Sequence, residues 1–138
     1  MAGMDDFLRT LGLCRRAGRL ALGDEPAGDA CRAHRCRLLL LAEDAADNTA
    51  RRAEHLAETG RCVLLRVPYG KEALGAAVGR SACALLAVTD QGLAGTLAGK
   101  LGRMDPVQYG ETALALAQKA ERLARRRKSK PKKSGPAG

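Results

Sequence analysis

The sequence predicts an α/β fold in which a buried sheet carries helices on both faces. The clearest strand is RLLLLAED, residues 37–44, where five apolar residues stand in a row. So short a run cannot span a bilayer, and its lack of alternation indicates that both faces of the strand are covered. Further apolar segments alternate with helical patterns along the chain, which is typical of layered α/β proteins.

The first half of the chain predicts two helices around a short strand. Acidic residues and then apolar residues at helical spacing predict a helix at residues 5–17, closed by Gly18. Residues 20–22 are long enough only for a short strand. The GDEP sequence at 23–26 predicts a turn into a second helix. Such a helix start offers backbone N–H groups to an anion, although an ordinary capped helix is the simpler interpretation.

The second half repeats this alternation after the central strand. Residues 46–49 supply capping side chains for a helix that should run to about Glu58 and stop at Gly60. The remaining elements are expected, in chain order, as strand 62–67, helix 71–78, strand 83–88, a helix from its cap at Asp90 to about residue 101, and a helix from about residue 111 to 127 after a boundary at Pro106 and Gly110.

Length and composition indicate one domain of common size with a tail. We assign residues 1–104 to the α/β domain and residues 105–138 to a basic C-terminal helix and a disordered polybasic tail. The chain contains no Trp, one Phe and two Tyr, which excludes a nucleic-acid surface built on stacked aromatic side chains.

The net charge of +9 is concentrated at the C-terminus. From Lys119 onward, nine lysines or arginines accompany a single glutamate, so residues 1–118 are nearly neutral. Such a tail binds phosphate by counterion release, whatever the base sequence. An anionic membrane would attract it as well, but without an apolar anchor we expect no membrane partner.

The five cysteines are odd in number and contain no Cys-x-x-Cys pair. They lie mostly in apolar segments, which indicates small buried side chains in a reducing cytoplasm, and the N-terminus carries no export signal. Because His34 and His55 fall outside any ligand pattern, no metal site is expected, and no cofactor either.

Nothing in the sequence predicts catalysis. It has no glycine-rich phosphate loop with a lysine, no nucleophile paired with a base, and no cofactor fingerprint. Glu43 and Asp44 follow the central strand, where an α/β enzyme could hold a carboxylate, but helix capping is the favoured role. We therefore expect neither an enzyme nor a small-molecule substrate.

Six short motifs are informative because of their order along the chain. They are LGLCRRAGRL (11–20), GDE (23–25), LLLLAEDAADNT (38–49), VPY (67–69), LGxAxG (74–79) and AVTDQGLA (87–94). With them the chain resembles the kink-turn-binding ribosomal-protein family, and within it the bacterial YlxQ-like branch, from about Leu8 to Leu101. The resemblance implies a three-layer α-β-α sandwich around a mixed four-stranded sheet, and RNA binding without catalysis.

Family members that bind kink-turns read guanines from a Gly-x-Asn-Glu turn, with a Lys shortly after it. The resemblance places the Asn at Asp24, the Glu at Glu25 and the Lys at Gly28, so only the Glu is kept. An ionised Asp cannot donate to guanine O6, and Gly28 removes a cation. Arg32, one helical turn beyond Gly28, could reach back in its place.

The resemblance implies a protein of the translation apparatus with a site for structured RNA, either rRNA or another kinked RNA. We expect the protein to be a monomer. The residues of this site, including the loop that covers a flipped-out nucleotide, would be Gly23, Asp24, Glu25, Gly28, Arg32, Arg80, Ser81 and Ala82. Sequence-independent phosphate contacts are expected from Arg15, Arg16, Arg19, Arg125, Arg126, Arg127, Lys128, Lys130, Lys132 and Lys133. The alternative is a module whose sandwich docks on a protein or ribosomal particle while the tail tethers it to rRNA.

Overall fold

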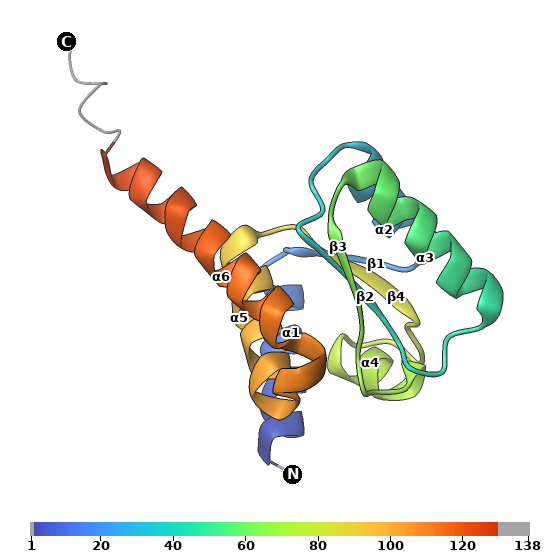
Figure 1. The fold of residues 1–138 in the computed structure, drawn as a ribbon. Coiled ribbons are helices and arrows are strands. Elements are labelled where there is room, and N and C mark those ends of the chain that lie inside the picture. The colour runs from blue at the N-terminus through green and yellow to red at the C-terminus, as the bar shows by residue number, and fades with distance from the viewer. Residues whose placement is uncertain (1, 130–138) are drawn as a thin grey trace.

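The structure, a computed structural model, describes residues 2–129. The side chains of residues 2–5 and 127–129 are not described. Helices and strands alternate as the sequence predicts, and the mixed sheet lies between helical layers (Figure 1). The elements are α1 (Ala2–Arg16), β1 (Leu20–Leu22), α2 (Asp24–Arg32), β2 (Leu38–Leu41), α3 (Asp47–Gly60), β3 (Val63–Arg66), α4 (Lys71–Ala77), β4 (Leu85–Val88), α5 (Gln91–Met104) and α6 (Pro106–Ser129).

The four strands lie in the order β1-β4-β2-β3. Strand β4 is antiparallel to both of its neighbours, whereas β2 and β3 run parallel. Leu38 and Leu20 both pair with Val88, so the start of β2 and the start of β1 share one end of the sheet. The end of β1 therefore lies with the start of β4 at the opposite end, and β1 itself is an edge strand.

Both faces of β2 are buried, as its unbroken apolar run predicts. Leu38 and Leu40 belong to the core beneath α1 and α5, while Leu39 and Leu41 belong to the core beneath α2 and α3. Side chains alternate between the faces of a strand, so one short run supplies two cores. Each buried leucine contributes roughly 1.5–3 kcal/mol by removal from water.

The two helical layers are unequal in composition. One face carries α1, α4 and α5, where Phe7 stacks on Tyr69 with ring centroids 5.2 Å apart. The other face carries α2 and α3 (Figure 1), which pack through small residues such as Ala27 and Ala53. Small side chains permit a close approach between the helices and the sheet.

Helix α6 begins earlier than its sequence pattern predicts. The predicted boundary at Pro106 and Gly110 is wrong, because Pro106 opens the helix and Gly110 lies inside it. Proline is tolerated in a first turn, and the Asp105 carboxylate accepts a hydrogen bond from the Gln108 amide at 3.2 Å. Tyr109 is buried, and its hydroxyl donates to the Arg66 carbonyl at 2.6 Å. The first half of α6 thus contributes to the core, while its far half extends away from the sheet (Figure 1).

The ends of two helices differ from prediction. Helix α3 includes Gly60, and Arg61 rather than the glycine takes the left-handed conformation, with φ of 53°. Helix α6 includes Lys128 and Ser129, which the sequence assigns to the disordered tail. The rest of that tail lies outside the described residues. Among residues 2–129, no helix has both the length and the apolar character that a bilayer span requires.

Candidate nucleic-acid interface

The turn between β1 and α2 is held by backbone geometry. Gly23 has a φ of 93°, which L side chains rarely adopt, so glycine is favoured there. Its amide donates to the Leu85 carbonyl at 2.9 Å, and its carbonyl accepts from the Ala27 amide at 3.0 Å. Asp24 and Glu25 follow in the first turn of α2 with exposed side chains. The turn therefore presents both carboxylates and the helix start to solvent.

Asp24 has a cationic neighbour that the sequence analysis did not identify. Arg52 on α3 places its Nε 3.5 Å from the Asp24 carboxylate, and both side chains are largely exposed. An exposed pair of this kind contributes only about 0–1 kcal/mol to stability. Its importance lies in location, because Arg52 brings a guanidinium beside the turn. No sequence signal connects the two residues, since they meet only when α2 packs beside α3.

Arg32 lies over Gly28, as the sequence hypothesis requires. A Cβ added to the buried Gly28 would lie 3.2 Å from Arg32 Nη1. The guanidinium donates to the Asp29 carboxylate at 2.8 Å, which holds it along the exposed side of the helix. The Arg32 guanidinium thus occupies the space next to position 28, although Arg32 itself lies one turn further along α2.

The loop after α4 packs against that helix at a glycine. A Cβ on Gly75 would lie 2.7 Å from the Ala82 backbone, a distance that real Cβ atoms essentially never show. The Arg80 amide donates to the Gly75 carbonyl at 2.7 Å, and Gly79 turns the chain with a φ of 79°. Arg80, Ser81 and Ala82 are all exposed. The glycines of the LGxAxG motif therefore position this loop.

The two predicted RNA-contacting segments meet at one end of the sheet. Pairing of β1 with β4 brings Gly23 next to Leu85, and the loop that ends at Ala82 leads directly into β4. The buried Cys83 thiol lies between them. Burial raises the pKa of Cys83, and the charges of both Arg80 and Asp24 act on it. The structure thus brings together segments that are more than 50 residues apart in the sequence.

An open groove of about 480 Å³ runs along the edge strand β1. Three arginines from separate segments line it: Arg15 near the end of α1, Arg35 after α2, and Arg80 in the loop after α4. Pro26 and Asp29 of α2 also line it. We call this surface the β1 groove. Sequence reasoning missed Arg35, because a single arginine in a loop carries no distinguishing signal.

The other predicted phosphate contacts of the α1 region are distributed differently. Arg16 lines a separate hollow between α1 and α4, together with Arg9. Arg19 is exposed, and its carbonyl accepts a hydrogen bond from the Thr89 amide at 2.9 Å. The structure therefore brings Arg15, but not Arg16, to the β1 groove.

A second basic surface lies near the opposite end of the sheet. Arg126 of α6 lines a hollow of about 220 Å³ that also includes Arg37, which immediately precedes β2. The remaining cations of this α6 surface are Lys119 and Arg122. Arg125 lies 3.9 Å from the Glu121 carboxylate one turn earlier. Among the other predicted contacts, the side chains of Arg127 and Lys128 are not described, and Lys130, Lys132 and Lys133 lie outside the described residues.

Comparison with known proteins places the chain among small α/β proteins. No protein-family model matches the sequence. The RNA-binding protein YlxQ of Bacillus subtilis (strain 168) is 39% identical over 101 residues, which cover 70% of this chain and 95% of that protein. A solved structure of a protein of unknown function from Bacillus halodurans has a TM-score of 0.64 at 26% identity, covering 69% of this chain and 95% of that one. The Giardia lamblia 15.5kD RNA-binding protein has a TM-score of 0.56 at 17% identity, covering 75% and 88%, and shares the fold.

Proposed function

Because the chain belongs to the family of the RNA-binding protein YlxQ, we propose that it binds structured RNA and catalyses no reaction. The observation that carries this proposal is the β1 groove, where guanidinium groups from three segments converge beside the exposed start of α2. Guanidinium groups suit phosphate oxygens, and backbone N–H groups at a helix start also favour anions. Donors carried on fixed backbone along one groove can recognise the path of a folded RNA backbone.

Within this proposal, a kinked RNA is the preferred ligand, and rRNA its expected source. Glu25 accepts hydrogen bonds from guanine edges, while Arg32 supplies the cation that Gly28 lacks. Arg52 reduces the repulsion between Asp24 and nearby phosphates. The loop at residues 80–82 covers an unstacked nucleotide. The arrangement of Gly23 and Gly75 supports this role, because both loops are fixed by backbone contacts before any RNA arrives.

The α6 surface has a different role in the proposal. Its cations add affinity for any RNA through phosphate neutralisation, and the segment beyond residue 129 adds more. These contacts read no base sequence. The α6 surface therefore strengthens binding to any RNA, whereas the β1 groove determines which RNA is preferred.

A binding comparison tests the proposal directly. Fluorescence anisotropy of the full chain is measured with a kinked duplex, with a straight duplex of matched length, and with an unrelated hairpin. Tighter binding to the kinked duplex supports the proposal, and this preference should persist as salt is raised. Equal binding to all three RNAs over the whole salt series contradicts a structured-RNA preference.

Docking on a protein or a ribosomal particle is the second candidate function. Val107 and Leu114 on α6 are 97% and 61% exposed, and their spacing of seven residues places them on one face of the helix. Exposed apolar residues that share a face are a feature of protein contacts. Substitution of both by Ser should leave RNA affinity unchanged but reduce co-sedimentation with ribosomal particles if this candidate is correct.

A further inference from the structure

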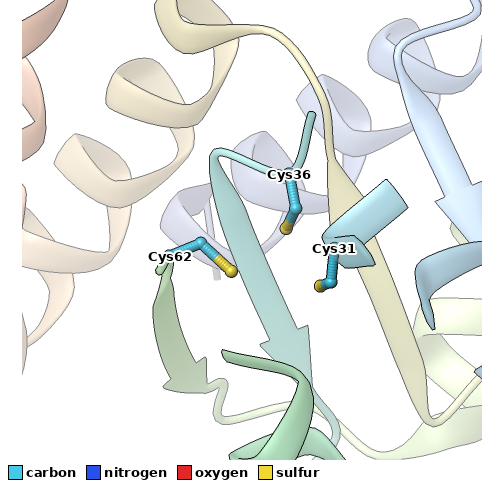
Figure 2. Close-up of side chains that lie close together, drawn as sticks. All are labelled: Cys31, Cys36 and Cys62. Atoms are coloured by element: carbon cyan, nitrogen blue, oxygen red, sulfur yellow. The ribbon is translucent and has the colours of Figure 1, made fainter. Parts of the chain in front are cut away.

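Three of the five cysteines lie together, although Cys62 is 26 residues beyond Cys36 in the sequence. Cys31 is in the last turn of α2, Cys36 precedes β2, and Cys62 precedes β3. Their Sγ atoms all lie within 4.8 Å of one another, and the side chains point toward a common space (Figure 2). Cys31 and Cys36 are buried, and Cys62 is half-buried. We call this group the cysteine trio.

Backbone packing fixes the positions of the trio. A Cβ on Gly60, the last residue of α3, would lie 3.1 Å from the Cα and Cβ of Cys31. The glycine therefore permits the end of α3 to approach the end of α2. Beyond the left-handed Arg61, the Cys62 amide donates to the Ala57 carbonyl at 3.1 Å, and parallel pairing of β2 with β3 begins one residue later. The three sulfurs thus project from backbone that packing and hydrogen bonds already hold.

We propose that Cys31, Cys36 and Cys62 bind a thiophilic metal ion, Zn²⁺, through their three sulfur atoms. Thiolates are soft ligands that select ions such as Zn²⁺ over the hard cations. Zn–S bonds of about 2.3 Å in a tetrahedral arrangement require sulfur atoms roughly 3.8 Å apart. No two of the sulfur atoms are more than 4.8 Å apart, so a movement of at most about 1 Å, which side-chain rotation can supply, brings them to that distance.

A hollow beside the trio provides access for the ion and space for a fourth ligand. Its volume is about 230 Å³, and Cys36, Cys62 and Gln91 are among the residues that line it. His34 also lines this hollow but is not a member of the sulfur group. The fourth position therefore faces the hollow, where a water molecule can complete the tetrahedron.

An unpartnered polar group provides an independent indication of a ligand in this hollow. Gln91 is only 8% exposed, and its Nε2 has no hydrogen-bond acceptor among the described residues. A buried amide donor without an acceptor is costly, and each such case in a native protein calls for an explanation. A metal-bound water or a metal-bound thiolate would give Gln91 an acceptor.

Charge balance also fits a three-thiolate site, because the cysteines must bind as thiolates and metal binding releases their protons to solvent. Three thiolates and one Zn²⁺ leave one negative charge, which the cations lining the hollow can offset: Arg37, Arg61 and Lys119.

Titration of the reduced full chain with Co²⁺, a spectroscopic substitute for Zn²⁺, tests the proposal. We expect thiolate-to-cobalt charge-transfer absorption that saturates at one ion per chain and disappears when Zn²⁺ is added. Cys62→Ser should weaken binding at least about tenfold, since loss of even a second-shell partner has an effect of that order. The matched control is Cys83→Ser, because Cys83 is also buried but lies in the other core, where its Sγ donates to the Leu85 carbonyl. It should bind Co²⁺ as the unaltered chain does.

Two further measurements separate metal binding from folding. Far-ultraviolet circular dichroism of Cys62→Ser, without metal, should match that of the unaltered chain, because Cys62 is the least buried member of the trio. Zn²⁺ should raise the melting temperature of the unaltered chain and of Cys83→Ser, but not of Cys62→Ser. Absence of charge-transfer absorption in the reduced, unaltered chain overturns the proposal. Equal loss of Co²⁺ binding in Cys62→Ser and Cys83→Ser overturns it as well.

Discussion

The β1 groove and the α6 surface are both basic, but they are built in different ways. In the groove, Arg15 and Arg80 come from segments far apart in the sequence and meet because the sheet joins them. On α6, Lys119, Arg122 and Arg126 follow one another at helical spacing, and Arg37 joins them from the start of β2. Tertiary structure shapes the first surface, whereas local sequence largely determines the second.

This difference indicates how each surface can contribute to binding. Close packing at Gly75 and the left-handed Gly23 hold the loops around the groove in one arrangement. Donors on preorganised loops favour one RNA shape over another, because the loops do not rearrange to fit both. A row of cations on an exposed helix responds mainly to phosphate density. The substitutions below test this division, from the largest expected effect to the smallest.

Gly75→Ala should have the largest effect. The added Cβ would lie 2.7 Å from the Ala82 backbone, so the loop at residues 80–82 must move. Overpacking of this kind should lower the free energy of unfolding by about 1–3 kcal/mol. Preference for kinked RNA should fall as well. Thermal denaturation and anisotropy provide the two measurements.

Gly99→Ala is the matched control for that experiment. Gly99 is also a helical glycine, but nothing lies within 4 Å of its added Cβ. It should leave RNA binding unchanged and stabilise the protein by up to about 1 kcal/mol through helix propensity. Equal destabilisation by the two substitutions would contradict the role assigned to the packing at Gly75.

Removal of two groove cations should reduce preference among RNAs. In Arg15→Ala/Arg80→Ala, two guanidinium groups that line the β1 groove are lost. If each makes one charge-assisted hydrogen bond, affinity for the kinked duplex should fall about tenfold or more. Affinity for a straight duplex should fall much less. The control, Arg103→Ala, removes an exposed arginine from the end of α5 and should alter neither value.

Removal of two α6 cations should act on all RNAs alike. In Arg122→Ala/Arg126→Ala, the log–log dependence of affinity on salt should become shallower by up to about 2 units, because fewer phosphates are neutralised. The ratio of affinities for kinked and straight duplexes should stay the same. A changed ratio would mean that α6 takes part in recognition.

Asp24→Asn should increase preference for the kinked duplex. The amide restores a donor for guanine O6 and removes a negative charge beside the RNA, with an expected gain of about 1 kcal/mol. Stability should change little, since the Asp24–Arg52 pair is exposed. Asp47→Asn, at the exposed start of α3, is the control. If Asp24→Asn leaves preference unchanged, Asp24 does not face a guanine.

Arg32→Ala should produce an effect as small as that of Asp24→Asn, but in the opposite direction. Loss of the guanidinium over Gly28 should reduce preference for the kinked duplex by roughly 1 kcal/mol. The Arg32–Asp29 pair is exposed, so the free energy of unfolding should change by less than about 1 kcal/mol. Unchanged affinity and preference would rule out Arg32 as a replacement for the missing lysine.

Sequence patterns revealed the two central strands, Leu38–Leu41 and Leu85–Val88, because they are short apolar runs buried on both faces. The sequence also predicted Asp90 as a helix cap, which the structure confirms. Helix starts without an apolar stripe were harder to locate. Helix α6 begins at Pro106 because Asp105 caps it, a signal weaker than the Gly110 that suggested a boundary.

The parts that sequence reasoning missed depend on contacts between distant segments. Arg52 meets Asp24 only through the packing of α3 beside α2. Cys31 and Cys62 meet because Gly60 permits a close approach of two helix ends. The sequence analysis interpreted Gly60 only as the residue at which a helix stops, so it did not predict this contact. Spacing rules detect ligands that share a segment, and the cysteine trio spans three.

The ratio of affinities for a kinked and a straight duplex, measured with the full chain at low and at raised salt, tests the central claim most directly. We predict that both affinities fall as salt increases while the ratio stays well above one, since the β1 groove sets the ratio and cations contribute to both affinities. A ratio of one at both salt concentrations would contradict this account.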